Sequence, residues 1–204
     1  MRAVLRFVAS VLMVSGAMLI ADAALTLTWQ EPVSAFLQDR QQAKLKKQLG
    51  GLPKSARKIV HFRALKGHAI GEIELPAIHK TAFVVQGTDA GSLRKGPGHY
   101  PSTPLPGKRG TVGIAGHRTT HGAPFRHIDD LKPGDRIVLD MPYGTFTYRV
   151  QGTRIVDPNA TWILRGVGYQ RLVLSACHPL YSAAQRIVVF ARFLRRTAPR
   201  VTRG

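Results

Sequence analysis

From about Lys66 onward the chain is built of short β-like runs that are separated by Gly- and Pro-rich turns. One run covers residues 145–151, and its first six residues, Thr-Phe-Thr-Tyr-Arg-Val, alternate between apolar and polar side chains, which is typical of a strand with one buried and one wet face. The other runs cover residues 69–75, 81–85, 111–115, 136–139, 170–175 and 187–193. Many short strands with frequent turns predict an all-β barrel or sandwich, with one short helix near residues 125–131.

The first 29 residues differ in composition, because most of them are apolar. Arg2 and Arg6 precede an apolar stretch from Phe7 to about Trp29, long enough to cross a bilayer as a helix, with Trp29 where an interfacial aromatic is expected. The alternative is a cleaved signal peptide, because Ala21-Asp22-Ala23 resembles a small-x-small cleavage site. Leu25 and Leu27 carry the apolar character past that site and favour an uncleaved anchor.

Residues 30–65 are expected to connect this anchor to the β-rich domain. Pro32 suits the first turn of a helix over residues 31–49, which Gly50-Gly51 and Pro53 would end, and Val33, Phe36 and Leu37 form a narrow apolar face. Two alternatives stay open: a stalk leading away from the membrane, or a helix packed on the domain. The orientation of the anchor is also open. Arg2 and Arg6 favour a cytoplasmic N-terminus, whereas basic residues lie near the other end, at Arg40, Lys44, Lys46 and Lys47.

The chain is strongly basic, with 30 Lys and Arg against 11 Asp and Glu and a formal net charge of +19. Such a charge favours anionic partners, among them nucleic acid, lipid headgroups and phosphate-rich wall polymers. The aromatic residues are few and scattered, and Lys and Arg form no single stripe, so no nucleic-acid partner is expected.

Cys177 is the only cysteine in the chain. It ends the apolar run from Arg171 and is followed by His178-Pro179. A lone thiol forms no internal disulfide and no Cys-based zinc site. Two interpretations remain, a buried inert thiol or a catalytic nucleophile, and a nucleophile needs a neighbouring base or cation for activation.

Two residues elsewhere in the chain suit that purpose. His117 follows the predicted strand 111–115 through a glycine, and Arg186 opens the next strand after the Cys177 loop. An arginine there can face a developing oxyanion or bind a backbone carbonyl of an extended peptide. Taken singly, each is as well explained by a surface histidine or a solvated strand-end charge.

The sequence motifs around these residues resemble those of the sortases, the cysteine transpeptidases of bacterial surfaces. Residues 110–129, which contain Gly116-His117-Arg118-Thr119-Thr120, look like their histidine segment, and Leu174-Ser-Ala-Cys-His-Pro179 followed by Arg186 looks like their cysteine strand and arginine. Further similar stretches are 85–88, 93–100 and 131–138, so the resemblance extends over residues 67–194. The histidine segment and the Cys-His-Pro sequel are most similar to class E sortases, with class D as the near alternative.

The resemblance implies an eight-stranded β-barrel, preceded by the membrane helix and helical stalk. It also implies a reaction in which Cys177 attacks the Thr–Gly carbonyl of a Leu-Pro-x-Thr-Gly- or Leu-Ala-x-Thr-Gly-like sorting motif in a secreted protein. A thioacyl-enzyme forms, and an amine such as that of a peptidoglycan precursor resolves it. His117 is then the general acid and base, and Arg186 stabilises the oxyanion or holds the substrate. Cofactors and metal ions are not expected.

One departure from the family pattern lies beside the nucleophile. Sortases typically carry Thr-Leu-x-Thr-Cys, where this chain has Val173-Leu-Ser-Ala-Cys177. Ala176 therefore replaces a threonine whose hydroxyl the family places beside the substrate, and the adjacent Ser175 points to the opposite face of a strand. Substrate contacts are expected from Ala176, Ser175, His178 and Arg118.

The resemblance divides the chain into an anchor (1–29), a stalk (30–65), a catalytic domain (66–195) and a basic tail (196–204). It implies a single-pass protein of the bacterial membrane with an extracytoplasmic catalytic domain. An L,D-transpeptidase is a weaker alternative, because that family places Cys, His and Arg in one compact run. A catalytically weak sortase-like or basic domain that binds anionic surface polymer is the remaining alternative.

Overall fold

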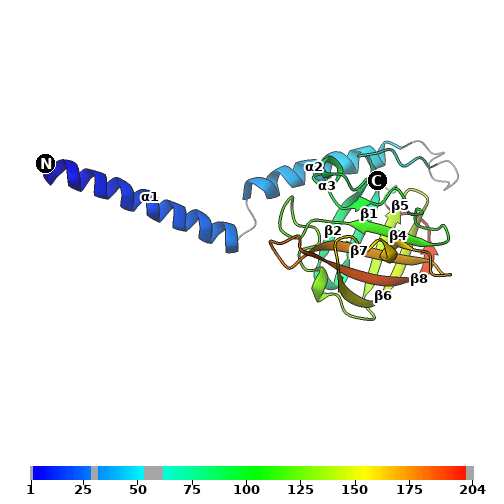
Figure 1. Ribbon diagram of the computed structural model, residues 1–204. Helices are drawn as coiled ribbons and strands as arrows, with labels where there is room; N and C mark the ends of the chain where they lie inside the picture. The colour runs from blue at the N-terminus through cyan, green and yellow to red at the C-terminus, as the bar shows by residue number, and fades with distance from the viewer. Residues whose placement is uncertain (1, 29–31, 53–61, 201–204) are drawn as a thin grey trace.

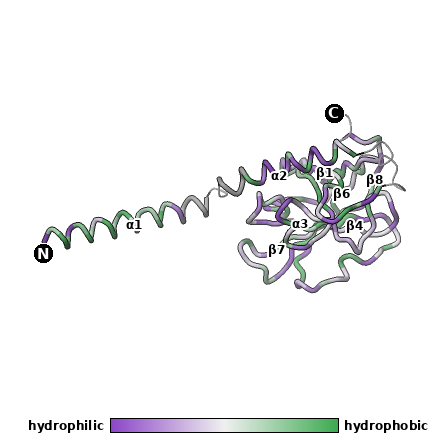
Figure 2. The backbone as a smooth tube through the Cα atoms, turned by 90° about the horizontal axis from the view of Figure 1, so that it is seen from above, coloured by the Kyte–Doolittle hydropathy of each residue, from purple (hydrophilic) through white to green (hydrophobic). Residues whose placement is uncertain are grey.

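The structure, a computed structural model, describes residues 2–28, 32–52 and 62–200, with side chains between 23 and 36 excepted. Figure 1 shows a barrel from which the N-terminal helix α1 (Arg2–Thr28) extends away. The stretch from Arg2 to Asp22 is apolar, none of it is buried, and it is long enough to cross a membrane. The green colouring of α1 in Figure 2 follows the same pattern. Trp29, the predicted interfacial aromatic, lies outside the described residues.

The β-rich part closes into an eight-stranded barrel, which confirms the expected fold. The strands are β1 (Ala69–Leu75), β2 (Lys80–Gln86), β3 (Gly98–His99), β4 (Thr111–Ala115), β5 (Arg136–Met141), β6 (Gly144–Val156), β7 (Arg171–His178) and β8 (Gln185–Thr197). Around the barrel their order is β1-β2-β3-β4-β7-β8-β6-β5. The short helices are η2 (Pro76–Ile78), α3 (Ala90–Leu93), η3 (Ile128–Asp130) and η4 (Thr161–Leu164). Of the helix expected near residues 125–131, only the three residues of η3 are helical, and they form a 3-10 turn.

Alternation along each strand fills the barrel. In β7, Leu172, Leu174 and Ala176 belong to the central apolar core, whereas Val173 packs outside it against Ile163 of η4. A half-buried pattern of this kind has period two because successive side chains leave opposite faces of a strand. The register of β7 therefore decides which of its residues face the core and which face outward.

The helix α2 (Pro32–Gly50) lies against the outside of the barrel. Leu45 and Leu49 are fully buried and pack with Ala69 and Val85. The side chains of α2 also satisfy strand backbone, since Gln42 Oε1 accepts a hydrogen bond of 2.7 Å from the amide of Phe83. Of the two alternatives for this helix, the contacts favour the one packed on the domain. The proposed apolar face at Val33 and Phe36 and the stop at Pro53 lie outside the described side chains.

Candidate active site

The β7 and β8 strands place Cys177 directly opposite Arg186. The two strands pair antiparallel over eight residue pairs, from Arg171↔Arg192 to His178↔Gln185, and Cys177↔Arg186 is the seventh. Directly opposed residues project from the same face of a sheet, with β-carbons about 5 Å apart. Cys177 is a free, half-buried thiol within reach of solvent, and its cross-strand neighbour is an arginine.

The face that Cys177 shares runs along the outside of the barrel. Ala176 is 3% exposed and packs in the barrel core with Ile187, its partner on β8. By alternation, Ser175 and Cys177 face outward together. The burial of Ala176 therefore does not support the expected contact between its side chain and the substrate, and Ser175 is the neighbour that shares the face of the thiol.

The Ser175 hydroxyl is held by a residue whose role the sequence did not reveal. Tyr100, which follows β3, lies with its hydroxyl 3.1 Å from Ser175 Oγ. Ser175 is only 2% exposed. The pair thus forms a buried hydroxyl–hydroxyl contact two residues from the thiol, and it binds the loop after β3 to the cysteine strand.

The β4 strand brings His117 to the same level as Cys177. It pairs in parallel with β7, with Ala115 opposite Ser175, and the amide of Gly116 extends the ladder with a 3.0 Å hydrogen bond to the Ser175 carbonyl. His117 and Cys177 each lie two residues beyond the last named pair. Neighbouring strands are about 4.8 Å apart, so the imidazole and the thiol lie at adjacent strand ends.

Gly116 is required by the packing of the residue that turns the chain there. A β-carbon at Gly116 would lie 2.4 Å from the fully buried ring of Phe125. The amide of Phe125 in turn donates a 3.0 Å hydrogen bond to the His117 carbonyl. The glycine before the histidine thus lets Phe125 close the loop over residues 117–125 and fix the exit of His117 from β4.

Burial lowers the pKa of His117 from its ordinary value, and the neighbouring His121 lowers it further. The rings of the two histidines lie 4.8 Å apart between centroids, with 31° between their planes. Both causes disfavour the imidazolium. The neutral ring of His117 is therefore more populated near neutrality than that of an exposed histidine.

Arg186 is half-buried, and hydrogen bonds from the turn before β8 hold its guanidinium. Nη1 donates to the carbonyls of Ala183 and Gln185, both at 2.9 Å. Of the five N–H groups of an arginine, the three on Nε and Nη2 are not used by these bonds. The turn thus orients the side chain and leaves donors that can point toward a substrate.

Arg118 is 3% exposed, and its side chain lies inside the loop that follows β4 and carries His117, called here the histidine loop. Its guanidinium donates to the Arg126 carbonyl and pairs with Asp129 at 2.6 Å. Nη1 also lies 3.3 Å from Nδ1 of the half-buried His178, on the strand that carries the cysteine. A direct substrate contact of Arg118 stays a prediction that its burial does not support, and its contacts indicate a brace between loop and strand.

The sequence alone did not point to two residues that contact the site. His121 packs against the ring of His117, and Asp129 forms the ion pair with Arg118. His121 lies four residues after His117, but a loop gives no periodicity from which to infer the contact. Among the described residues, no group of three or more His, Cys, Asp or Glu side chains is arranged to hold a metal ion.

Comparison with known proteins points to a single family. A family model described as "Sortase domain" matches residues 73–194. Sortase D of Bacillus subtilis is 35% identical over 135 residues, which cover 64% of this chain and 67% of that protein. Sortase SrtE1 of Streptomyces coelicolor is 28% identical over 144 residues, which cover 63% of this chain and 41% of that protein. The solved structure of sortase E from Streptomyces avermitilis, 27% identical, superposes with a TM-score of 0.61 over 68% of this chain and 99% of that one. Both class D and class E relatives are among these matches, so the preference for class E stays a prediction.

Proposed function

Because this chain belongs to the sortase family of cysteine transpeptidases, we propose that it cleaves a sorting motif between Thr and Gly through a thioacyl intermediate on Cys177. The observation that carries the proposal is the register of three strands. It sets Cys177 opposite Arg186 on β8, and brings His117, at the end of β4, alongside Cys177 on β7. The residues proposed as nucleophile, acid–base group and cation thus lie at neighbouring strand positions at one end of the barrel, and this arrangement supports acyl transfer.

In the first half of the reaction, the Cys177 thiolate attacks the threonine carbonyl carbon and forms a tetrahedral oxyanion. The C–N bond to glycine then breaks, and the His117 imidazolium donates its proton to the leaving amine. In the second half, an incoming amine attacks the thioester while neutral His117 accepts its proton. The thiolate leaves, and a new amide bond replaces the one that was cleaved.

The lowered pKa of His117 affects these two halves in opposite ways. It reduces the fraction of molecules that carry an imidazolium near neutrality, but it makes that imidazolium a stronger acid toward the leaving amine. It also favours the neutral ring that activates the acceptor. The arrangement suits an enzyme in which only a minority of molecules is poised to begin the reaction.

The role proposed for Arg186 is to face the substrate with its Nε and Nη2 donors. These groups can stabilise the developing oxyanion or bind a carbonyl of the extended sorting peptide. The hydrogen bonds of Nη1 to the turn support this role. They already restrict the side chain, so less conformational entropy is lost when it binds substrate.

The proposed substrates are secreted proteins with a C-terminal sorting signal, and the proposed acceptor is an amine such as that of a peptidoglycan precursor. Class E resemblance favours a Leu-Ala-x-Thr-Gly motif over Leu-Pro-x-Thr-Gly. His178, which is half-buried and follows Cys177 in β7, is the substrate neighbour that the geometry supports best, whereas Ser175 is 2% exposed and its contact with substrate stays a prediction.

The proposed location is the bacterial membrane, with α1 as a single-pass anchor and the barrel on the extracytoplasmic side. The exposed apolar surface of α1 supports an anchor. Arg2 and Arg6 before the span support a cytoplasmic N-terminus. The opposing basic residues Lys44, Lys46 and Lys47 lie exposed on α2, which packs on the barrel.

The test incubates the full chain in detergent micelles with peptides that carry either motif and with a diglycine acceptor. We expect a covalent acyl adduct on Cys177, visible by mass because the chain has one cysteine. Cys177→Ala should reduce transfer to background while retaining the barrel circular dichroism. His117→Ala should lower kcat by about 10²- to 10⁴-fold, the usual contribution of a general acid–base group.

Two results would overturn the proposal. Transfer that survives in Cys177→Ala would show that another group is the nucleophile. Wild-type protein that forms no adduct with either motif, yet binds anionic wall polymer as tightly as Cys177→Ala does, would favour the basic binding domain instead.

A further inference from the structure

The ring of His121 lies against His117, with 4.8 Å between the ring centroids. His121 adopts a left-handed backbone conformation, with φ of 52°. Its Nδ1 is buried, and no described residue forms a hydrogen bond with it. A buried ring nitrogen without a partner among the described residues calls for an explanation, and the contact with His117 offers one.

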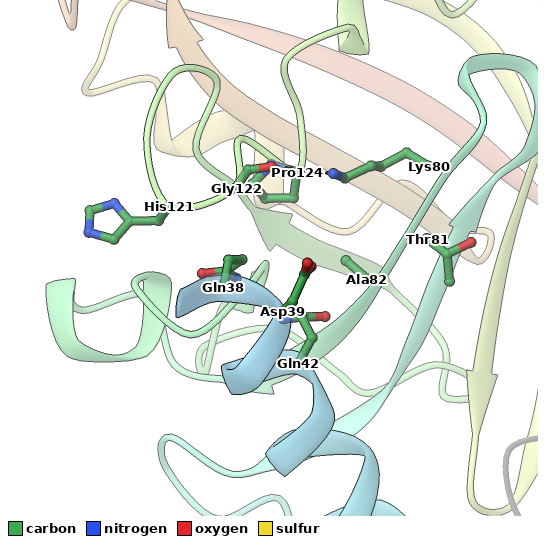
Figure 3. A pocket seen from close by; sticks show the side chains of 9 residues that line it. All are labelled: Gln38, Asp39, Gln42, Lys80, Thr81, Ala82, His121, Gly122 and Pro124. Atoms are coloured by element: carbon green, nitrogen blue, oxygen red, sulfur yellow. Dashed lines mark hydrogen bonds between the residues drawn. The ribbon is translucent and has the colours of Figure 1, made fainter. Parts of the chain in front are cut away.

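The loop that carries His121 is held from two directions, as Figure 3 shows. From β2, the ammonium group of Lys80 donates a 3.3 Å hydrogen bond to the Gly122 carbonyl. From α2, Gln38 packs so closely that a β-carbon on Gly122 would lie 2.5 Å from its Cγ. Gly122 also has a positive φ of 71°. The backbone beside His121 is therefore clamped between a strand and the helix that follows the anchor.

The ionisable groups that share the two pockets bordered by His121 are mostly basic. They are Asp39, Arg40 and Lys44 of α2, Lys80 of β2, and Arg94 and Lys95 at the end of α3. One carboxylate and five cations therefore give the surroundings of His121 a predominantly positive charge.

We propose that His121 is a positioning residue for His117: its ring fixes the plane of the His117 imidazole and covers that face from water. The inference rests on the proposed function, in which His117 is the general acid and base. It accounts for the lowered pKa of His117, for which burial is the larger cause and His121 the second. The ring contact would thus make the His117 imidazolium a stronger acid toward the leaving amine, while it reduces the fraction of molecules in which His117 is protonated.

Two variants separate the ring from its charge. His121→Phe keeps an aromatic ring against His117 and removes the titratable nitrogen. His121→Asn removes the ring, and asparagine is one of the residues that best tolerate a left-handed backbone. The matched control is His127→Asn, because His127 is exposed, lies in the same segment and pairs only with Asp130 among the described residues.

The readouts are the His117 pKa, by NMR titration of the histidine-labelled full chain in micelles, and the pH profile of peptide transfer. We expect His121→Phe to raise the His117 pKa, because the opposing charge is gone while burial remains. The limb of the profile that His117 controls should move upward with it. His121→Asn should raise the pKa further, because water then reaches the imidazole, and should lower kcat by up to about 10²-fold, the scale of a catalytic group misplaced by about 1 Å.

An unchanged His117 pKa in both variants, or an equal shift in His127→Asn, would overturn the inference. A raised pKa with an unchanged kcat in His121→Asn would also overturn it, because the ring would then not position His117 for catalysis. The NMR titration needs no substrate, so failure of the proposed function and failure of the ring contact give different results. In the first case transfer is absent and the pKa still shifts.

Discussion

The two halves of the candidate site are held in different ways. Cys177 and Arg186 lie within a continuous antiparallel ladder, as the seventh pair counted from Arg171↔Arg192. His117 lies just past the end of β4, in a loop where His121, Gly122 and Ala123 all have positive φ. The strand ladder sets the spacing of Cys177 and Arg186, whereas the position of His117 also depends on side-chain packing in the loop.

This difference predicts where the site tolerates change. A ladder depends on the register of many residues, so one side-chain substitution leaves the spacing of Cys177 and Arg186 intact. The histidine loop depends on a few contacts, chiefly the Phe125 ring against Gly116 and the Arg118 brace to Asp129. Substitutions on the ladder should therefore change chemistry without changing geometry, and substitutions in the loop should change both.

Of the three further substitutions that probe this difference, Arg186→Ala on the ladder is expected to have the largest effect. It removes the donors that are proposed to face the oxyanion and should lower kcat by about 10²- to 10³-fold, the scale for loss of one such donor. The thermal midpoint should change little, because Arg186 is only half-buried. Arg186→Lys should recover only part of the rate, since an ammonium lacks the planar fork of a guanidinium.

Steady-state kinetics with a sorting peptide and a melting curve provide the measurement. The control is Arg195→Ala, an exposed arginine on the same strand, opposite Thr147 and far from the thiol. A rate for Arg186→Ala within threefold of wild type would contradict this prediction, because the residue that the ladder places opposite Cys177 would then have no chemical role.

In the loop, Gly116→Ala places a β-carbon where the Phe125 ring lies. Overpacking of this kind costs about 1–3 kcal/mol of folding free energy. The displaced ring should also move His117, so kcat should fall together with stability. Urea unfolding and kinetics on the same preparation test this prediction.

Gly152→Ala is the matched control, because a β-carbon there meets nothing within 4 Å. If Gly116→Ala loses stability and keeps its full rate, the position of His117 does not depend on the packing of Phe125. The contrast between the two halves would then need another basis.

The smallest effect is expected at Tyr100→Phe, which deletes the hydroxyl beside Ser175. It should cost about 1 kcal/mol in urea unfolding, the usual value of a buried neutral hydrogen bond. The rate should stay within about twofold if the ladder alone positions Cys177. Tyr169→Phe, whose hydroxyl contacts the Gln151 side chain at an exposed site, is the control. A tenfold loss of kcat in Tyr100→Phe would show that the thiol also depends on side-chain support.

Much of the barrel could be predicted from the sequence. The run at residues 145–151 lies within β6, and that at residues 187–193 lies within β8, although both strands extend further at each end. β3 escaped prediction, because a strand of two residues carries no periodicity. The packed position of α2 was left open, since its few apolar residues, Leu45 and Leu49 among them, do not show what they contact.

Of the site, the sequence pointed to Cys177, His117 and Arg186 by residue type and by the family wording around them. Whether these three carry the chemistry stays a prediction for the experiments above. The residues that support them could not be found in this way. Arg118 looked like a substrate contact and lies buried against Asp129, and Ala176 looked like a substrate neighbour and lies in the core.

The sequence by itself determined the fold class, the apolar helix and the one thiol that can act as a nucleophile. Alternation and turn residues are local properties, and so is the length of an apolar run, which is why they can be read along the chain. Only the tertiary structure decided which side chains face Cys177, because facing depends on strand register and on loop closure. The contact of His121 with His117 is the clearest case: it results from the packing of Lys80 and Gln38 around Gly122, from distant parts of the sequence.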